Sequence, residues 1–272
     1  MVDVAGLEND WQAKLKRVFI IPLLVGNIAF IVVGIVTGWW GVAVTAAGQL
    51  LLFAVIAMKF SRSLNAAPAV VVGGAGVVIS FTQGAGATVL ALLCFALLMV
   101  YVFWYSTNGR TPSEALAIGS TLPELTFTDL DGNPVRSADW AGSPTVLLFY
   151  RGTWCPLCTV QVREMAEQYR EIDALGARVV LVSPQPATES AKLARQFDAP
   201  MTFLVDEDNA AARVLGIQHP GGAPLGVAPE AESVLPTAVV VDADGVVRFA
   251  HETDNYRIRP DPELFLETLR TL

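Results

Sequence analysis

Charged side chains are nearly missing from the first part of this 272-residue chain. Between residues 18 and 109 the only charged side chains are Lys59 and Arg62, and acidic residues and histidines are absent. Ionisable groups inside a membrane usually mark ion or substrate paths, so their absence argues against a transporter. With 53% hydrophobic residues and a mean hydropathy of +0.49, the chain is too apolar for an ordinary soluble protein. A membrane domain is therefore expected at residues 18–105.

The apolar region is divided into stretches that approach the length of a membrane span. Crossing about 30 Å of hydrocarbon takes about 20 residues. Four stretches qualify or come close, at residues 18–38, 41–58, 68–81 and 88–105. The third is short and rich in glycine, so four spans are expected, with three as the alternative if residues 68–81 are re-entrant. Homo-oligomer formation through the glycine-containing helices is an open alternative to a monomer.

Residues 1–17 form the segment before the first span. Leu7, Trp11 and Leu15 recur at four-residue spacing, which predicts a short interfacial helix, with a frayed terminus as the alternative. The first span is too long for a signal-peptide core and lacks a clear cleavage site, so cleavage is not expected.

The positive charges beside the spans indicate an orientation. Lys14, Lys16 and Arg17 precede the first span, and Lys59 and Arg62 lie between the second and third. Under the positive-inside rule these loops are cytoplasmic, so four spans place the remainder of the chain in the cytoplasm. Three spans would place it outside. The expected location is an inner or plasma membrane, with the lipid bilayer as a partner.

Charge returns at Arg110 with an excess of acid. From there to the end of the chain, 13 Lys and Arg face 23 Asp and Glu. A surface of this sign repels phosphate, so nucleic acid is not an expected partner. Residues 106–120 are interpreted as a linker and residues 121–272 as a soluble domain.

The soluble part alternates strand-like and helix-like stretches. Turn residues Asp131 and Gly132 predict an early hairpin, and a second hairpin is expected near Gly245. Residues 145–150 and 178–182 are continuous apolar runs typical of buried strands, and residues 156–175 have a helical pattern. Parallel connections followed by a late hairpin predict an α/β sandwich with a mixed sheet and helices on both faces.

Cysteine is scarce, with three residues in the whole chain, yet two of them lie three positions apart. Pro156 is expected at the first helical position, which places Cys155 near the N-cap and Cys158 in the first turn. The positive end of a helix stabilises a thiolate and lowers its pKa. We expect Cys155 to be the more exposed, attacking sulfur and Cys158 to close a disulfide onto it.

Three other interpretations of this cysteine pair stay open. A zinc site needs four ligands, and only His219 and His251 could complete it. Two inert cysteines are a second alternative, and a structural disulfide would not suit a reducing cytoplasm. The third cysteine, Cys94, lies in the last apolar stretch and is expected to be a small packing residue.

The segment FYRGTWCPLCTVQVREM resembles the AhpC/TSA-type, peroxiredoxin-like branch of the thioredoxin superfamily, and the resemblance runs from about Gly119 to Leu272. It implies a thioredoxin-like α/β fold and thiol chemistry that needs neither an organic cofactor nor a metal. It also implies that Pro236 is a cis-proline opposite the cysteines, with a strand-edge proline as the alternative.

The match to peroxiredoxins proper is incomplete around the cysteines. If Cys158 is aligned with the peroxidatic cysteine, Cys155 occupies the usual Thr or Ser place and Arg151 the proline place. If Cys155 is chosen instead, Gly152 occupies the Thr or Ser place. No arginine stands beside Pro236, although Arg151 is close to the cysteines in sequence.

Other residues near the pair have expected roles of their own. Thr153 could donate to a thiolate or serve the turn, and Trp154 is expected to pack beside the site as a lid. Arg257 and Arg259 are interpreted as a solvated connection, with an anion contact as the alternative. Gly222 belongs to a Gly/Pro-rich loop that is expected to border the site.

The leading hypothesis is a membrane-anchored thiol–disulfide oxidoreductase that uses the CPLC dithiol on a protein disulfide and is served by a thioredoxin- or glutathione-type reductant. The alternative is a thiol peroxidase that reduces hydroperoxides through a sulfenic acid. A hypothesis from another class is a membrane scaffold that senses redox state.

Overall fold

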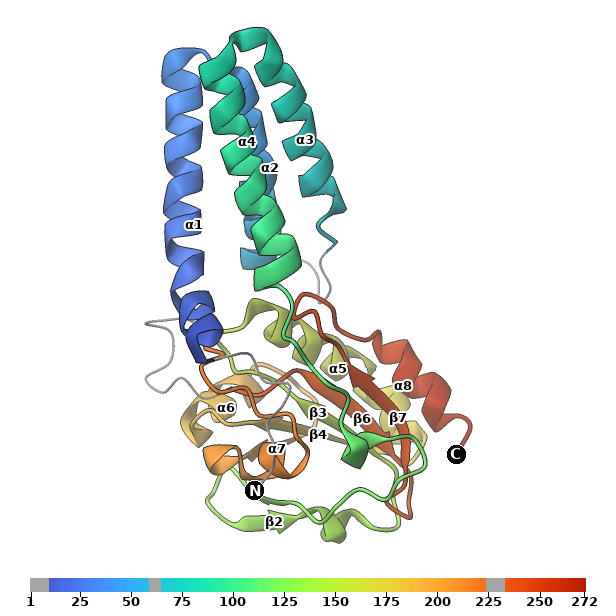
Figure 1. Ribbon diagram of the computed structural model, residues 1–272. Coiled ribbons are helices and arrows are strands. Elements are labelled where there is room, and N and C mark those ends of the chain that lie inside the picture. The colour runs from blue at the N-terminus through green and yellow to red at the C-terminus, as the bar shows by residue number, and fades with distance from the viewer. Residues whose placement is uncertain (1–9, 59–64, 224–232) are drawn as a thin grey trace.

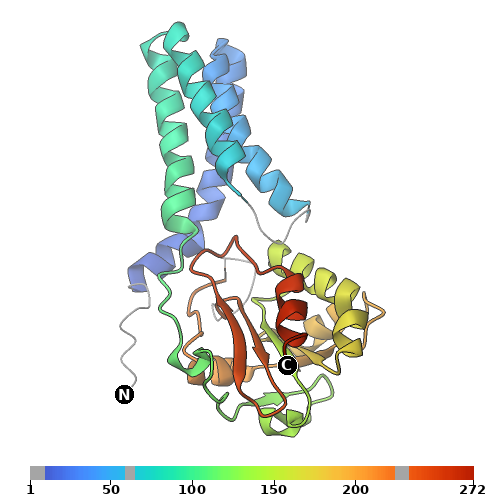
Figure 2. The ribbon, with the colours of Figure 1, turned by 90° about the vertical axis from the view of Figure 1, so that its right-hand side faces the viewer.

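The computed structural model describes residues 10–58, 65–223 and 233–272. Two parts are visible, a bundle of four helices and an α/β part on which the bundle stands (Figures 1 and 2). Of the predicted features, Leu7 of the interfacial segment and the charged loop with Lys59 and Arg62 lie outside the described residues.

The bundle contains a helix at each of the four predicted apolar stretches. Its helices are α1 (Asp10–Thr37), α2 (Trp40–Ala57), α3 (Ala67–Ser80) and α4 (Ala85–Val100), and a π-helical turn at Tyr101–Tyr105 extends α4. Two segments of the described chain, Leu15–Thr37 and Ala85–Tyr105, are long and apolar enough to cross a membrane. The other two apolar helices are shorter, Trp40–Ile56 and Ala67–Gln83, so length and composition support two spans and leave four spans a proposal. The described residues of the predicted interfacial segment, 10–17, form the beginning of α1 and are not a separate helix.

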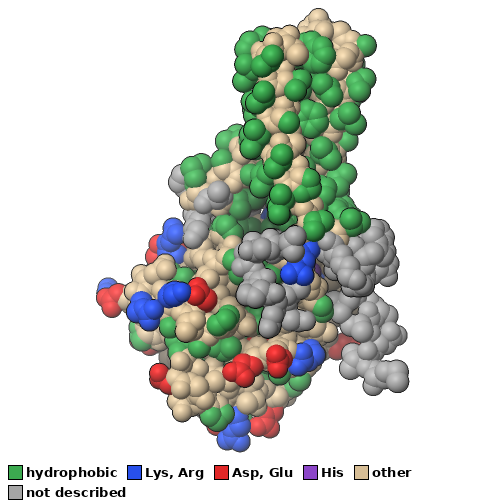
Figure 3. All heavy atoms as spheres, turned by 90° about the vertical axis from the view of Figure 1, so that its left-hand side faces the viewer, with side chains coloured by type: hydrophobic (Ala, Val, Ile, Leu, Met, Phe, Trp, Pro, Cys, Tyr) green, Lys and Arg blue, Asp and Glu red, His purple; other side chains and the backbone are tan. Residues whose placement is uncertain are grey.

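The bundle brings α2 and α3 together through small residues and exposes many large apolar side chains, while Leu23, Leu52 and Leu98 fill its interior. A Cβ atom built on Gly41 or Gly76 would lie 2.6 Å from the carbonyl oxygen of the other glycine, so α2 and α3 touch backbone to backbone. Val25, Val36 and Val71 are among the many apolar side chains exposed on the helices. Figure 3 shows this apolar cover on the bundle and charged side chains on the α/β part. An exterior of this kind suits contact with lipid.

The α/β part is built on a seven-stranded mixed sheet in the order β2-β1-β5-β4-β3-β6-β7. Its strands are β1 (Thr126–Thr128), β2 (Pro134–Arg136), β3 (Thr145–Phe149), β4 (Arg178–Ser183), β5 (Thr202–Val205), β6 (Thr237–Val241) and β7 (Val247–Glu252). Strands β3, β4 and β5 are parallel, and the other pairs are antiparallel. Both predicted hairpins are present, as β1–β2 and β6–β7, which confirms the mixed sheet.

Helices cover both faces of this sheet, as the sequence predicted. On one face α5 (Pro156–Ala174), α6 (Ala187–Ala194) and α8 (Pro262–Leu269) pack against side chains such as Val146 and Leu181. On the other face α7 (Ala210–Val214) packs with Trp140 and Leu116. Together with the mixed sheet, this gives the thioredoxin-like α/β arrangement.

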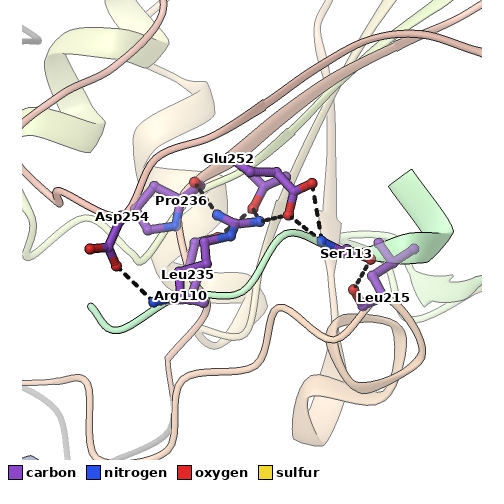
Figure 4. A network of polar contacts seen from close by, with 8 residues as sticks. Arg110, Ser113, Leu215, Leu235, Pro236, Glu252 and Asp254 are labelled. Atoms are coloured by element: carbon purple, nitrogen blue, oxygen red, sulfur yellow. Dashed lines mark hydrogen bonds and ion pairs between the residues drawn. The ribbon is translucent and has the colours of Figure 1, made fainter. Parts of the chain in front are cut away.

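The segment at residues 106–120 connects the two parts and is held to the sheet. Arg110 forms an ion pair with Glu252 at 2.6 Å, and the two side chains are only 2% and 11% exposed. Arg110 also donates to the carbonyl oxygen of Pro236 at 3.1 Å, and its backbone N–H donates to Asp254 at 2.7 Å. Figure 4 shows this network, in which Ser113 also donates to Glu252. The predicted linker is therefore a fixed strap along β7.

Candidate active site

The loop between β3 and α5 brings the two cysteines to the end of the central strand. Gly152 in this loop has φ +139°, a region that L side chains rarely adopt. A Cβ atom there would lie 2.6 Å from Nε1 of Trp154, so the turn also lacks room for a side chain. The N–H of Cys155 donates to the Gly152 carbonyl at 3.1 Å, and α5 starts at the next residue. Glycine at this position lets the chain turn sharply into the helix.

Cys155 is the N-cap of α5, and Pro156 is its first residue, as predicted. The N–H groups of Cys158 and Thr159 both donate to the carbonyl of Cys155, at 3.1 and 3.2 Å. Both cysteines are free thiols, and Cys155 is 4% exposed and Cys158 0% exposed. The predicted order of exposure holds, although both thiols are buried. Trp154 and Tyr256 pack against the cluster that contains both cysteines, and this packing encloses them.

The pair is electrostatically asymmetric. A hydrogen bond from the Cys158 thiol is the largest influence on Cys155 and lowers its pKa to about 5, against the opposing effect of burial. The charges of Arg151 and Arg259 lower it further. Burial, followed by the neighbouring Cys155, raises the pKa of Cys158 well above its ordinary value. Cys155 is therefore the thiolate, and Cys158 the protonated thiol that donates to it.

Arg151 lies between two aromatic rings beside this thiolate. Its guanidinium carbon is 4.7 Å from the centroid of the Trp154 ring and 5.7 Å from that of Tyr256, both within cation–π range. It donates one hydrogen bond to the carbonyl of Gly222, so the predicted loop borders the site. Within the described parts of the chain, Arg151 has no acidic partner and its Nε has no hydrogen bond. Among the described residues its charge acts on Cys155 and His219.

Arg259 is the second cation at the site, a residue for which the sequence analysis gave an anion contact only as the alternative. Its Nη2 lies 3.8 Å from Sγ of Cys158, and its Nη1 donates to the carbonyls of Tyr256 and Ile258 at 2.5 and 2.8 Å. Arg257 is buried as well and donates to Oγ of Ser106 at 2.9 Å. The solvated connection predicted here is therefore wrong, because backbone carbonyls and the end of the bundle fold around both guanidinium groups. The alternating arginines in NYRIRPDP were the available signal.

Thr153 is engaged through its backbone, in agreement with a role in the turn. Its N–H donates to Oε1 of Gln185 at 2.8 Å. The amide of Gln185 in turn donates to the hydroxyls of Tyr150 and Ser190, at 3.1 and 2.9 Å. Gln185 follows β4, far from the cysteines in sequence, and it fixes the loop from the neighbouring strand. No motif in the sequence indicated this residue.

Pro236 lies beside the site, but its peptide bond corrects the prediction. Because Phe149 pairs with Thr237 in the antiparallel β3–β6 ladder, Pro236 is placed next to Tyr150, where the cysteine loop begins. The described residues contain no cis peptide bond, so the cis-proline expectation is wrong. The trans chain enters β6 in an extended form, with the N–H of Leu235 bonded to Ile217 at 2.8 Å and the Pro236 carbonyl held by Arg110.

The zinc alternative is not supported by the histidines. The described residues contain no group of three or more His, Cys, Asp or Glu side chains that could hold a metal ion. His219 lies near Arg151 and Lys16, and burial followed by these charges lowers its pKa to about 3. Cys94 is remote from the pair in the chain and packs inside the bundle, with Sγ 3.7 Å from Oδ1 of Asn27. Its expected packing role agrees with this placement.

Comparisons with known proteins agree with this arrangement. The AhpC/TSA family model matches residues 118–250. The chain is 30% identical over 179 residues to chloroplastic peroxiredoxin Q from Sedum lineare. This alignment covers 62% of this chain and 90% of that protein. It is 27% identical over 162 residues to the thiol–disulfide oxidoreductase ResA from Geobacillus thermodenitrificans, covering 59% and 82%.

A solved structure shows the same fold. The mutant peroxiredoxin 6 of Arenicola marina superposes with a TM-score of 0.50 at 13% identity, over 57% of this chain and 72% of that one. The AhpC/TSA match begins after the four helices of the bundle.

Proposed function

This chain is a redox enzyme of the AhpC/TSA family, and on that premise we propose that it is a membrane-anchored thiol–disulfide oxidoreductase that uses Cys155 and Cys158. One observation carries the proposal: two free, buried cysteines lie at the N-cap and in the first turn of α5, where the Cys158 thiol lowers the pKa of Cys155. This is the arrangement that attack and resolution require.

The proposed reaction moves two electrons from the dithiol to the substrate. The Cys155 thiolate attacks one sulfur of a disulfide, forms a mixed disulfide and releases the other sulfur as a thiolate, which takes a proton. The Cys158 thiol then loses its proton and attacks Sγ of Cys155. The substrate leaves as its second thiol, and the enzyme holds a Cys155–Cys158 disulfide. One external thioredoxin-type dithiol, or two glutathione-type monothiols, then reduce the Cys155–Cys158 disulfide and leave as a disulfide themselves.

Peroxide reduction is the second candidate, and the two arginines favour it. Arg151 and Arg259 place positive charge at the sulfurs, where it would stabilise the anion that leaves a peroxide bond. The Cys155 thiolate would attack one oxygen of ROOH to give a sulfenic acid and, after protonation, ROH. Cys158 would then condense with the sulfenic acid to form the disulfide and water.

The bundle supports the membrane part of the proposal. Leu15–Thr37 and Ala85–Tyr105 are long and apolar enough to span, and the exterior of the bundle is apolar. We place all four helices in the membrane and the α/β part on the cytoplasmic side, beside Lys16 and Arg17. Protease digestion of inside-out and right-side-out vesicles tests this placement. Cleavage of the α/β part only in right-side-out vesicles would refute it.

Trapping experiments on the full chain test the chemistry. We expect Cys158→Ser to accumulate a mixed disulfide with a disulfide substrate, visible by mass spectrometry, because the resolving thiol is missing. Cys155→Ser should accumulate none and lose turnover. Parallel assays with hydrogen peroxide and with an oxidised protein substrate separate the two candidates. Turnover retained by Cys155→Ser, or thiols unchanged by both oxidants, would overturn the proposal.

A further inference from the structure

The end of the bundle and the α/β part meet at three tyrosines. The hydroxyls of Tyr101 and Tyr256 lie 2.6 Å apart and share a hydrogen bond. Tyr101 stacks on Tyr105 with 5.4 Å between ring centroids, and Tyr105 meets Tyr256 edge to face at 5.8 Å. Tyr101 and Tyr105 belong to the turn that extends α4, whereas Tyr256 follows β7. The contact therefore joins the membrane helices to the redox part of the chain.

The same tyrosine continues the contact to the active site. The face of Tyr256 lies 5.7 Å from the guanidinium carbon of Arg151, which lies over Trp154 on its other side. Arg151 in turn acts on the charge of Cys155, and Tyr105 is close enough to interact with Cys155 as well. A short series of side chains thus leads from α4 to the attacking sulfur.

Arg151 depends on these rings for its orientation. Arg110 is held by a carboxylate, a carbonyl and a hydroxyl. Arg151 has a single hydrogen-bond partner, the carbonyl of Gly222, and Nε is buried without a hydrogen bond in both arginines. An arginine with so few polar anchors keeps its direction by stacking. Removal of the Tyr256 ring would free its guanidinium group.

The bundle also holds the segment that carries Arg259. The N–H of Tyr256 donates to the Ser106 carbonyl at 3.1 Å, and Nε of Arg257 donates to Oγ of Ser106 at 2.9 Å. Ser106 is itself bonded to the carbonyl of Tyr101 through both its N–H and its Oγ. The backbone between Tyr256 and Arg259 is therefore tied to the last turn of the bundle.

We propose that Tyr101 and Tyr105 are positioning residues for the redox site, which act through Tyr256 to fix Arg151 beside Cys155. The bundle then completes the active site in addition to anchoring it. This inference rests on the proposed role of Cys155 as the reacting sulfur. It assigns to the helices a part in the chemistry that a separate α/β domain would lack.

The pH dependence of Cys155 alkylation in the full-length protein in nanodiscs tests this role. The groups that face Cys155 are Cys158, Arg151, Arg259 and Tyr105. Tyr256→Leu removes the ring below Arg151, and we expect the alkylation midpoint to rise by about one pH unit, which slows alkylation about tenfold below the midpoint. Mass spectrometry of the Cys155 peptide after iodoacetamide treatment gives the rate.

Conservative variants keep the test valid if Tyr256→Leu does not fold. Tyr101→Phe and Tyr256→Phe each remove the shared hydrogen bond and keep the rings, so we expect equal, smaller shifts and no further shift in the double variant. Tyr169→Phe is the matched control, because Tyr169 lies on α5 with its hydroxyl near Asp173 and should leave the midpoint unchanged.

An unchanged midpoint in Tyr256→Leu and in both Phe variants, with the wild-type near-UV spectrum, would overturn the inference. Turnover of disulfide and peroxide is measured separately. If no substrate turns over while the midpoint shifts as expected, the proposed function fails and the positioning role stands.

Discussion

The bundle and the α/β part place their apolar side chains in opposite directions. In α1 the side chains of Val25, Ile28 and Val36 are exposed, whereas every residue of β3 is buried. The α/β part thus forms a conventional core under a charged surface, whereas the bundle has a small core around Leu98 and many large apolar side chains on its exterior. This difference is what the proposed placement predicts, because an apolar exterior is favourable in lipid and an apolar interior is favourable in water.

The two parts also differ in how they use buried polar groups. The bundle buries uncharged side chains such as Asn27, Thr45 and Gln49. The α/β part buries full charges, Arg257 and Arg259 together with the Arg110–Glu252 pair. A buried charge is tolerated only with partners at good geometry, so the charged groups should be the most sensitive points of the molecule.

The largest effect is expected at the buried ion pair. Glu252→Gln removes the carboxylate opposite Arg110 and should lower the free energy of unfolding by about 3–5 kcal/mol, because an unpaired charge stays buried. Denaturant unfolding of the reduced protein in micelles, followed by tryptophan fluorescence, measures it. The matched control is Glu189→Gln, whose pair with Lys192 is largely exposed and should change stability by about 1 kcal/mol or less. An equal loss of unfolding free energy in Glu252→Gln and Glu189→Gln would contradict this prediction.

A second pair of variants compares the two exteriors directly. Ile28 in α1 and Val214 in α7 are both 56% exposed. On the proposed placement of α1 in the membrane, Ile28→Arg should cost about 2.5–3.5 kcal/mol and reduce the yield in membranes, because its side chain would face lipid near the middle of the span. Val214→Arg should stay within about 0.5 kcal/mol, since its side chain faces water. Folded yield and thermal melting of both variants in nanodiscs give the measurement. An Ile28→Arg variant with wild-type yield and melting temperature would contradict the prediction.

The close contact between α2 and α3 should respond to a single methyl group. Gly76→Ala would place Cβ 2.6 Å from the Gly41 carbonyl oxygen, so the helices must separate, at a cost of about 1–3 kcal/mol. Gly74→Ala is the control, with nothing within 4 Å of the added atom. Melting temperatures of both variants in the same detergent give the measurement. Equal melting temperatures of Gly76→Ala and Gly74→Ala would contradict the prediction.

The smallest effect concerns the thiol pair in the α/β part. Cys158→Ala removes the donor to Cys155 and should raise its alkylation midpoint from about 5 by roughly one unit, whereas Cys158→Ser keeps an O–H donor and should shift it less. Stopped-flow alkylation between pH 4 and 8 gives the midpoints of the wild type and both variants. Equal midpoints in the wild type and Cys158→Ala would contradict the prediction.

The same pKa predicts how stability depends on pH. Since the folded-state pKa of Cys155 lies below the ordinary 9.0, its contribution to the stability of the reduced protein is present above pH 9 and is lost as pH falls through about 5.

Local signals in the sequence predicted most of the fold. Such signals depend only on neighbouring residues in the chain, so the local structure could be predicted from them. They include the apolar run of β3, the turn at Asp131 and Gly132, and Pro156 at the start of α5. For the same reason the N-cap position of Cys155 was predicted correctly.

The parts that the sequence did not reveal depend on contacts between distant segments. Arg259 reaches Cys158 only because the chain after β7 folds back under the bundle. The enclosure of Cys155 depends on Tyr256 in the same segment, and the trans bond at Pro236 on Arg110 and Ile217. Side chains from the cysteine loop, from the segment after β7 and from the end of the bundle lie together at this site. The spacing of residues in the sequence does not predict contacts between such distant segments.

The strap at residues 106–120 limits where the redox site can travel. A free chain of this length could extend by about 50 Å and let a tethered domain search the volume around its anchor. Here Arg110, Ser113 and the backbone near Asp254 remove that freedom, so the cysteines stay at one height beside the bundle. With the bundle in the membrane as proposed, the site meets only molecules that diffuse along the bilayer surface or come up to it, so the density of partners at the membrane, more than their bulk concentration, sets the rate of encounter.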